Sequence, residues 1–181
     1  RMQIEETPIK DLVIVKPKVF PDDRGFFYET FNAKTFKELG LDVKFVQDNI
    51  SLSQKGVLRG IHFQKPPYAQ GKLVQVLKGA VLDITVDLRK YSPSYGQYFS
   101  YVLSEENKTQ LYVPEGFGHG FVTLEDETLF SYKCTNFYNK ESEGGIFWND
   151  KDLNIDWQIE NPIISEKDQM AQSFADFESP F

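Results

Sequence analysis

Cysteine and histidine are scarce in this 181-residue chain, and each scarcity excludes something. The single cysteine, Cys134, has no partner for an intrachain disulfide, which fits a reducing compartment. The two histidines, His62 and His119, are too few for a metal site that combines three histidines with a carboxylate. Neither disulfides nor a histidine-rich metal centre is therefore expected.

Basic residues and long apolar runs are also in short supply. The net charge of -7 and a pI near 4.9 argue against nucleic acid as a partner, because phosphate binding needs a broad basic surface. No apolar run approaches the roughly 20 residues that a membrane helix requires, and the first residues lack the pattern of a signal peptide. We therefore expect a cytoplasmic protein that binds neither nucleic acid nor membrane.

Aromatic residues, in contrast, are abundant. The 16 Phe and 9 Tyr lie in short apolar runs broken by Gly, Pro, Asn and Asp, which favours sheet over helix. The length and the 40% hydrophobic content suit one compact domain over residues 1–181.

Alternation of apolar and polar residues marks the predicted strands. It is clearest over 81–88, where one face carries Leu82, Ile84, Val86 and Leu88. A strand over 72–77 precedes it, and Lys78-Gly79 between the two predicts a tight hairpin turn. Further strands are expected over 25–31, 57–63, 97–103, 110–113, 120–124 and 128–136. Many short strands with little helix predict a sandwich or a jelly-roll barrel, whose mouth can hold a ligand.

Helices are few and short. Asn32 is a helix cap before a turn or two carrying Phe36 and Leu39, with Gly40 past the end. Ser165 followed three residues later by Asp168 resembles a capping box and predicts a C-terminal helix over about 165–176.

Five motifs follow one another along the chain. They are Asp23–Glu29, Phe45–Asn49, Gly56–Gln64, Gln70–Val74 and Pro114–Phe121. The Pro-x-Gly-x-x-His pattern of the last motif is common among cupins, but five motifs in order with matching spacing are specific. Together they resemble the dTDP-4-dehydrorhamnose 3,5-epimerase family over nearly the whole chain, and segments 145–150 and 165–168 add two further matches.

The resemblance implies a mainly β, cupin-type jelly-roll barrel that forms a homodimer, often with exchanged N-terminal strands. It implies inversion of C3 and C5 in a dTDP-linked 4-keto-6-deoxyhexose. A ketone at C4 acidifies the hydrogens on both neighbouring carbons, so one base, one acid and one enolate stabiliser can serve both. The reaction therefore requires neither a metal nor a redox cofactor.

The resemblance assigns the base to His62 and its orientation to Asp168. Imidazole suits that role because its ordinary pKa of about 6.5 leaves it neutral at physiological pH. By residue type alone, His62 also fits a buried structural histidine. Asp168 likewise occupies the position of a capping-box acid, and the two roles are compatible.

Lys72 and Tyr132 are the remaining catalytic candidates. Lys72 is in phase with Val74 and Val76, so a strand would point its ammonium inward, where a cation stabilises an enolate well. The alternative is a solvated lysine at the strand end. Tyr132 is in phase with Phe130 as ordinary core packing would be, and the resemblance implies that it donates the proton on the face opposite the base.

Substrate contacts are expected from two groups of residues. Arg24 and Arg59 suit the diphosphate, since guanidinium groups bind phosphate oxygens bidentately. Strict alternation puts Arg59 and His62 on opposite faces, and a bulge at Gly60 would resolve this conflict. The resemblance and the alternation pattern add Phe27, Glu29, Gln47, Asn49, His119, Glu143 and Lys167, with Asp83 as a partner for His119.

Three alternatives stay open at the sequence level. A metal-dependent cupin is disfavoured because Phe63 and Gln64 follow His62, which leaves no His-x-His pair. A non-catalytic sugar-nucleotide binding module is disfavoured by the intact catalytic candidates. A single-centre epimerase or a ketoisomerase shares the base and the fold, so the sequence discriminates it poorly.

Overall fold

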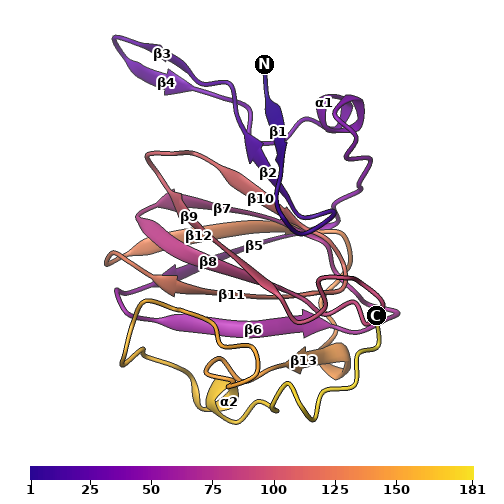
Figure 1. Cartoon of the computed structure of the whole chain (residues 1–181). Helices are drawn as coiled ribbons and strands as arrows, with labels where there is room; N and C mark the ends of the chain where they lie inside the picture. The colour runs from indigo at the N-terminus through magenta and orange to yellow at the C-terminus, as the bar shows by residue number, and fades with distance from the viewer.

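The computed structural model describes all residues, 1–181, and consists mainly of two antiparallel sheets that form a barrel (Figure 1). The six-stranded sheet has the order β1 (Gln3–Glu6), β2 (Val13–Lys16), β10 (Gln110–Val113), β7 (Lys72–Lys78), β12 (Thr128–Cys134) and β5 (Gln47–Ser53). The five-stranded sheet has the order β13 (Glu143–Gly145), β6 (Leu58–Gln64), β11 (Phe117–Thr123), β8 (Ala80–Asp87) and β9 (Tyr98–Ser104). This is the mainly β, cupin-type jelly roll that the sequence predicts.

A short hairpin stands apart from the barrel. Its strands, β3 (Phe20–Asp22) and β4 (Gly25–Phe27), pair only with each other and project away from the sheets in Figure 1. The predicted strand over 25–31 ends at Phe27, so Glu29 does not share a strand face with the phenylalanines beside it.

The barrel interior is an apolar cluster built from alternate residues of both sheets. Val74 and Val76 of β7 and Phe130 of β12 meet Phe117 and Phe121 of β11 there. Burying a side chain of this size contributes about 1.5–3 kcal/mol to folding. These aromatic and β-branched side chains close the inner part of the barrel and leave its mouth to polar residues.

The outer face of the five-stranded sheet is covered by the C-terminal segment. Trp157 and Phe177 pack there against the predicted apolar face, formed by Leu82, Ile84 and Val86 of β8 and by Leu88 directly after it. The shared face of these four residues is confirmed, and β8 is buried on both sides.

The turn at Lys78 and Gly79 is not a hairpin. β7 pairs with β10 and β12, whereas β8 pairs with β11 and β9, so the turn carries the chain from one sheet to the other. Gly79 has a φ of +87°, and a Cβ there would lie 3.0 Å from the Thr128 Cα. The local pattern is the same for a hairpin and a corner, so the prediction was wrong because the pairing is decided by distant strands.

The two helices are short. α1 (Ala33–Glu38) begins at the predicted cap, where the Asn32 side chain accepts a hydrogen bond from the Thr35 N–H. α2 spans only Glu166–Gln169, so the expected extension to residue 176 is wrong. The chain leaves the helix because Gln172 forms a parallel bridge with Ile146, and its carbonyl accepts from the Phe147 N–H. A single 3₁₀ turn, Lys140–Ser142, precedes β13.

No helix in the structure is long and apolar enough to cross a membrane.

Candidate active site

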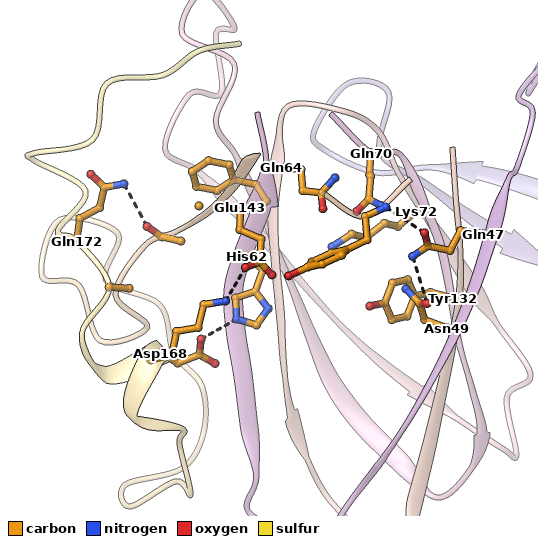
Figure 2. A pocket seen from close by; sticks show the side chains of 16 residues that line it. Gln47, Asn49, His62, Gln64, Gln70, Lys72, Tyr132, Glu143, Asp168 and Gln172 are labelled. Carbon is orange, nitrogen blue, oxygen red and sulfur yellow. Dashed lines mark hydrogen bonds and ion pairs between the residues drawn. The ribbon is translucent and has the colours of Figure 1, made fainter. Parts of the chain in front are cut away.

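A cavity of about 400 Å³ opens at the mouth of the barrel (Figure 2). Its walls come from β5, β7 and β12 of one sheet, from β6 and β13 of the other, and from the segment around α2. It brings together the predicted residues His62, Lys72, Tyr132, Asp168, Gln47, Asn49, Glu143 and Lys167.

His62 and Asp168 form a hydrogen-bonded pair in this cavity. The His62 Nε2 lies 2.7 Å from the Asp168 Oδ1, and the Gly60 N–H donates to the other carboxylate oxygen at 3.1 Å. The His62 side chain is 46% exposed, whereas that of Asp168 is 7% exposed. Burial raises the pKa of Asp168, but the hydrogen bonds and charge of its neighbours outweigh burial, so the pKa falls below its ordinary value. The carboxylate is therefore ionised at neutral pH and accepts a hydrogen bond from the His62 Nε2–H.

Helix α2 places Asp168 opposite His62. The Ser165 hydroxyl caps the helix by accepting from the Asp168 N–H at 3.1 Å. Asp168 is thus both the third residue after a helix cap and the partner of His62. The pairing with His62 is present, but the Asp168 carboxylate bonds to His62 and the Gly60 N–H and not to the Ser165 N–H, so the reciprocal bond of a capping box is absent.

A bulge in β6 puts Arg59 and His62 on one face. The residue paired with His62 is His119, and the residue paired with Arg59 is Phe121, so Gly60 and Ile61 together oppose Gly120. Gly60 has a φ of +132°, and a Cβ there would lie 2.6 Å from the Gly120 Cα. Glycine is needed at this point, and the predicted bulge is confirmed.

Lys72 and Tyr132 lie on the opposite sheet from His62. The Lys72 ammonium stands 5.5 Å from the centre of the Tyr132 ring. Desolvation lowers the pKa of Lys72, and desolvation raises the pKa of Tyr132 despite the opposing influence of the Asn49 amide. The phenol therefore keeps its proton at neutral pH, as a proton donor must.

A second ion pair closes the rim near His62. The Lys167 ammonium lies 2.8 Å from the Glu143 Oε2. Burial raises the pKa of Glu143, but Lys167, the Tyr138 hydroxyl and His62 together outweigh burial and lower it. Glu143 is thus a carboxylate at neutral pH and places a negative charge beside the imidazole.

Gln47 and Asn49 sit side by side on β5. The Gln47 amide donates to the Asn49 Oδ1 at 3.3 Å, and the Asn49 amide lies 3.8 Å from the Cys134 sulfur. These two predicted contacts line the cavity, although part of their hydrogen-bonding capacity is used within the protein.

His119 and Arg59, two predicted substrate contacts, do not line the cavity itself. His119 is buried in the barrel, where its Nε2 lies 2.6 Å from the Oδ2 of the fully buried Asp83, so the suspected pairing is confirmed. Arg59 lines an adjoining groove that shares His62, Lys167 and Asp168 with the cavity. Its guanidinium donates to the Ser53 hydroxyl at 3.0 Å.

Arg24, Phe27 and Glu29 are not brought to the cavity within one chain. Arg24 and Phe27 belong to the projecting hairpin, where Arg24 pairs with Asp22 at 2.6 Å. Phe27 is 67% exposed, and Glu29 accepts a hydrogen bond from the Asn32 amide.

The cavity also contains residues for which the sequence predicted no role. They are Phe63, Gln64, Gln70, Tyr138, Gly144, Gly145, Ala171 and Gln172. Gln64 and Gln70 lie inside two of the recognised motifs, which was the available signal. Tyr138 lies in an irregular segment after β12, where no periodicity points to a face.

No group of three or more His, Cys, Asp or Glu side chains lies close enough together to hold a metal ion.

The fold and the site together define a class of protein. A cupin-type barrel whose mouth carries a histidine–aspartate pair opposite a lysine and a tyrosine is typical of an isomerase that works by acid–base catalysis.

The comparison with known proteins gives the family. A sequence model of dTDP-4-dehydrorhamnose 3,5-epimerase matches residues 6–176, and the chain belongs to this family. The dTDP-4-dehydrorhamnose 3,5-epimerase of Shigella flexneri is 54% identical over 97% of both chains.

Solved structures agree with the sequence comparison. The crystal structure of the enzyme of this name from Elizabethkingia anophelis NUHP1 has a TM-score of 0.92 and 56% identity over 97% of both chains. The Legionella pneumophila dTDP-6-deoxy-D-glucose-3,5-epimerase, in complex with dTDP-4-keto-L-rhamnose, has a TM-score of 0.94 and 48% identity, covering 98% of this chain and 95% of its own.

Proposed function

We propose that this chain is an epimerase that inverts C3 and C5 of dTDP-4-dehydro-6-deoxy-D-glucose and so forms dTDP-4-dehydro-L-rhamnose. The observation that carries this proposal is the placement of His62 and Tyr132 on facing sheets around one cavity. Inversion needs a base on one side of the sugar ring and an acid on the other. The Legionella relative in complex with the corresponding keto-sugar nucleotide supports the choice of substrate.

The first half-reaction is proton removal by His62. Because the ionised Asp168 accepts a hydrogen bond from the Nε2–H, the ring proton stays on Nε2 and the lone pair is on Nδ1, which is the basic atom. Nδ1 takes the proton from the carbon next to the C4 ketone, and the electron pair of the broken C–H bond moves to the C4 oxygen. The Lys72 ammonium stabilises the resulting enolate.

The second half-reaction is proton delivery by Tyr132. The electron pair returns from the C4 oxygen, and the carbon takes the phenolic proton on the face opposite His62. The protein then holds an imidazolium and a phenolate, and proton exchange with solvent restores both groups. The same cycle at the other flanking carbon completes the second inversion.

Arg59 and Lys167 are the cations for the diphosphate. Both line the groove that adjoins the cavity at His62, so a sugar held at His62 would extend its diphosphate toward them. Because Lys167 pairs with Glu143, its ammonium lies near the cavity rim.

The projecting hairpin suits a homodimer in which it reaches the cavity of a second copy. Phe20, Phe26 and Phe27 are 55%, 59% and 67% exposed, an unusual density of bare aromatic rings on one hairpin. In such a dimer Arg24, Phe27 and Glu29 would join the partner's cavity. A mixture of His62→Asn and Arg24→Ala chains would then recover activity, because a mixed dimer has one complete site. Mixed chains no more active than the separate variants would contradict this arrangement.

Incubation with dTDP-4-dehydro-6-deoxy-D-glucose in heavy water, followed by NMR, tests the reaction. Deuterium at both C3 and C5 is the expected result. Exchange at C3 alone would indicate a single-centre epimerase, and binding without exchange would indicate a binding module.

A further inference from the structure

Gln64 holds the backbone on both sides of Tyr138. Its Nε2 donates to the Phe137 carbonyl at 3.1 Å and to the Tyr68 carbonyl at 2.8 Å, and its Oε1 accepts from the Asn139 N–H at 3.0 Å. Both ends of this buried amide are therefore used within the protein. An amide whose hydrogen bonds are all made in this way fixes the segment that it binds. Breaking these hydrogen bonds would leave buried polar groups without partners, which is costly.

Two further glutamines hold the same segment. The Gln70 Nε2 donates to the Asn136 carbonyl at 2.8 Å, and the Tyr138 N–H donates to the Gln47 Oε1 at 3.0 Å. Gln47, Gln64 and Gln70 all line the cavity and are labelled in Figure 2. We call these three residues the glutamine clamp. It binds four consecutive residues, 136–139, which have no helix or strand of their own.

The segment held by the clamp places the aromatic ring of Tyr138 at the cavity. Tyr138 is 54% exposed and lines the cavity, and its hydroxyl interacts with Glu143. Of the other aromatic residues in the lining, Phe63 is buried against Phe177, and Tyr132 lies against Lys72. Tyr138 is thus the ring with an open surface for a planar group.

Gln64 makes no direct hydrogen bond to the proton-transfer groups His62, Lys72 and Tyr132. Loss of the clamp would loosen the segment that carries Tyr138 and leave the histidine–aspartate pair and the lysine in place. Binding of the nucleotide is then the step that depends on it.

We infer that Gln64 is a positioning residue that holds Tyr138 in place for the nucleotide part of the substrate. It contributes affinity for dTDP rather than proton transfer. The physical reason is preorganisation: a loop fixed before binding loses little conformational entropy when the ligand arrives. This inference rests on the proposed function, because it takes a dTDP-linked substrate as given.

The test uses Gln64→Met, which keeps the length of the side chain and removes its three hydrogen bonds. We expect the Kd for dTDP, measured by calorimetry, and the KM for the keto-sugar nucleotide to rise about tenfold. The turnover number at saturation should change by less than about twofold, because the proton-transfer groups stay in place. Gln75→Met, a matched substitution on β7 outside the cavity, should change neither.

A double variant decides whether Gln64 acts through Tyr138. If it does, Gln64→Met adds nothing to the loss of dTDP affinity caused by Tyr138→Ala. Additive losses, or a lower turnover number with unchanged dTDP affinity, would overturn the inference. If Gln64→Met does not fold, Gln70→Met is used instead, because it removes one hydrogen bond of the clamp. This variant should bind dTDP more weakly without a lower turnover number. An unchanged Kd for dTDP in Gln70→Met would also overturn the inference. The Kd for dTDP is measured without any turnover. The role of Gln64 is therefore tested independently of the role of His62 as the base.

Discussion

His62 and Asp168 are 106 residues apart in the sequence, yet their side chains are joined by a hydrogen bond of 2.7 Å. The bond links β6 of the barrel to a four-residue helix near the C-terminus. It fixes which ring nitrogen carries the proton and therefore which nitrogen is basic. The C-terminal segment thus contributes a side chain to the candidate site as well as to the packing.

Asp168→Asn is expected to lower kcat by about 10²–10⁴-fold, because the uncharged amide no longer favours the tautomer with a basic Nδ1. Steady-state rates with the keto-sugar nucleotide measure the loss. Asp152→Asn, at an exposed position, is the matched control and should leave kcat unchanged. An Asp168→Asn enzyme of normal activity would show that the pair is structural.

Tyr132→Phe should separate the two half-reactions. Proton removal by His62 does not need the phenol, so deuterium still enters from heavy water. Inversion should fall by about 10²–10⁴-fold, because the acid on the opposite face is gone. NMR reports exchange and product configuration in one sample. A variant that loses exchange and inversion equally would contradict the role of Tyr132 as the acid alone.

The ionisation of Lys72 is expected to set the alkaline limb of the pH profile of kcat/KM. Desolvation lowers its pKa below the ordinary 10.5, so the ammonium that stabilises the enolate is lost at a lower pH than for a free lysine. The pKa of Tyr132 is raised, so the phenol does not account for this limb. We expect kcat/KM to fall as the pH rises toward 10.5, with a flat alkaline limb in a less active Lys72→Arg variant. An unchanged limb in that variant would assign the titration to another group.

Gly60→Ala should destabilise the protein by about 2–5 kcal/mol, because the methyl group meets the Gly120 backbone and φ is positive. Urea unfolding measures the loss. Gly40→Ala is the control, since Gly40 also has a positive φ but a Cβ added there would have no other atom within 4 Å. The same loss in both variants would mean that backbone strain, and not the close approach of β11, requires glycine in the bulge.

Protonation of Asp87 is expected to lower the free energy of unfolding in acid. Burial raises the pKa of this carboxyl, but Arg89, Ser92 and Ser94 outweigh burial and lower it. A lowered pKa contributes stability that is present above the unfolded value of about 3.9 and is lost as the pH falls through the folded value. The difference in unfolding free energy between the wild type and Asp87→Asn should therefore shrink below about pH 4. A constant difference down to pH 2 would contradict the lowered pKa.

The sequence predicts the barrel well because its signals are local. Alternation over β8 gives the shared face of Leu82 and Ile84, and the caps Asn32 and Ser165 give the starts of both helices. The corner at Gly79 and the early end of α2 were missed because they depend on pairing with distant segments. Local patterns contain no information about which remote strand a segment will join.

The candidate site was predicted unevenly for the same reason. Lys72 and Tyr132 follow from the phase of their strands, and His62 follows from its motif. The bulge at Gly60 was predictable because, without it, strict alternation would put the candidate residues Arg59 and His62 on opposite faces. Tyr138 was not, because its position is set by glutamines from three parts of the chain.

The most direct test of the account is deuterium exchange by His62→Asn. If His62 is the base for both centres, the folded variant incorporates no deuterium at C3 or C5 of the keto-sugar nucleotide in heavy water, while it still binds dTDP. Exchange at either carbon at the wild-type rate would show that another group removes that proton.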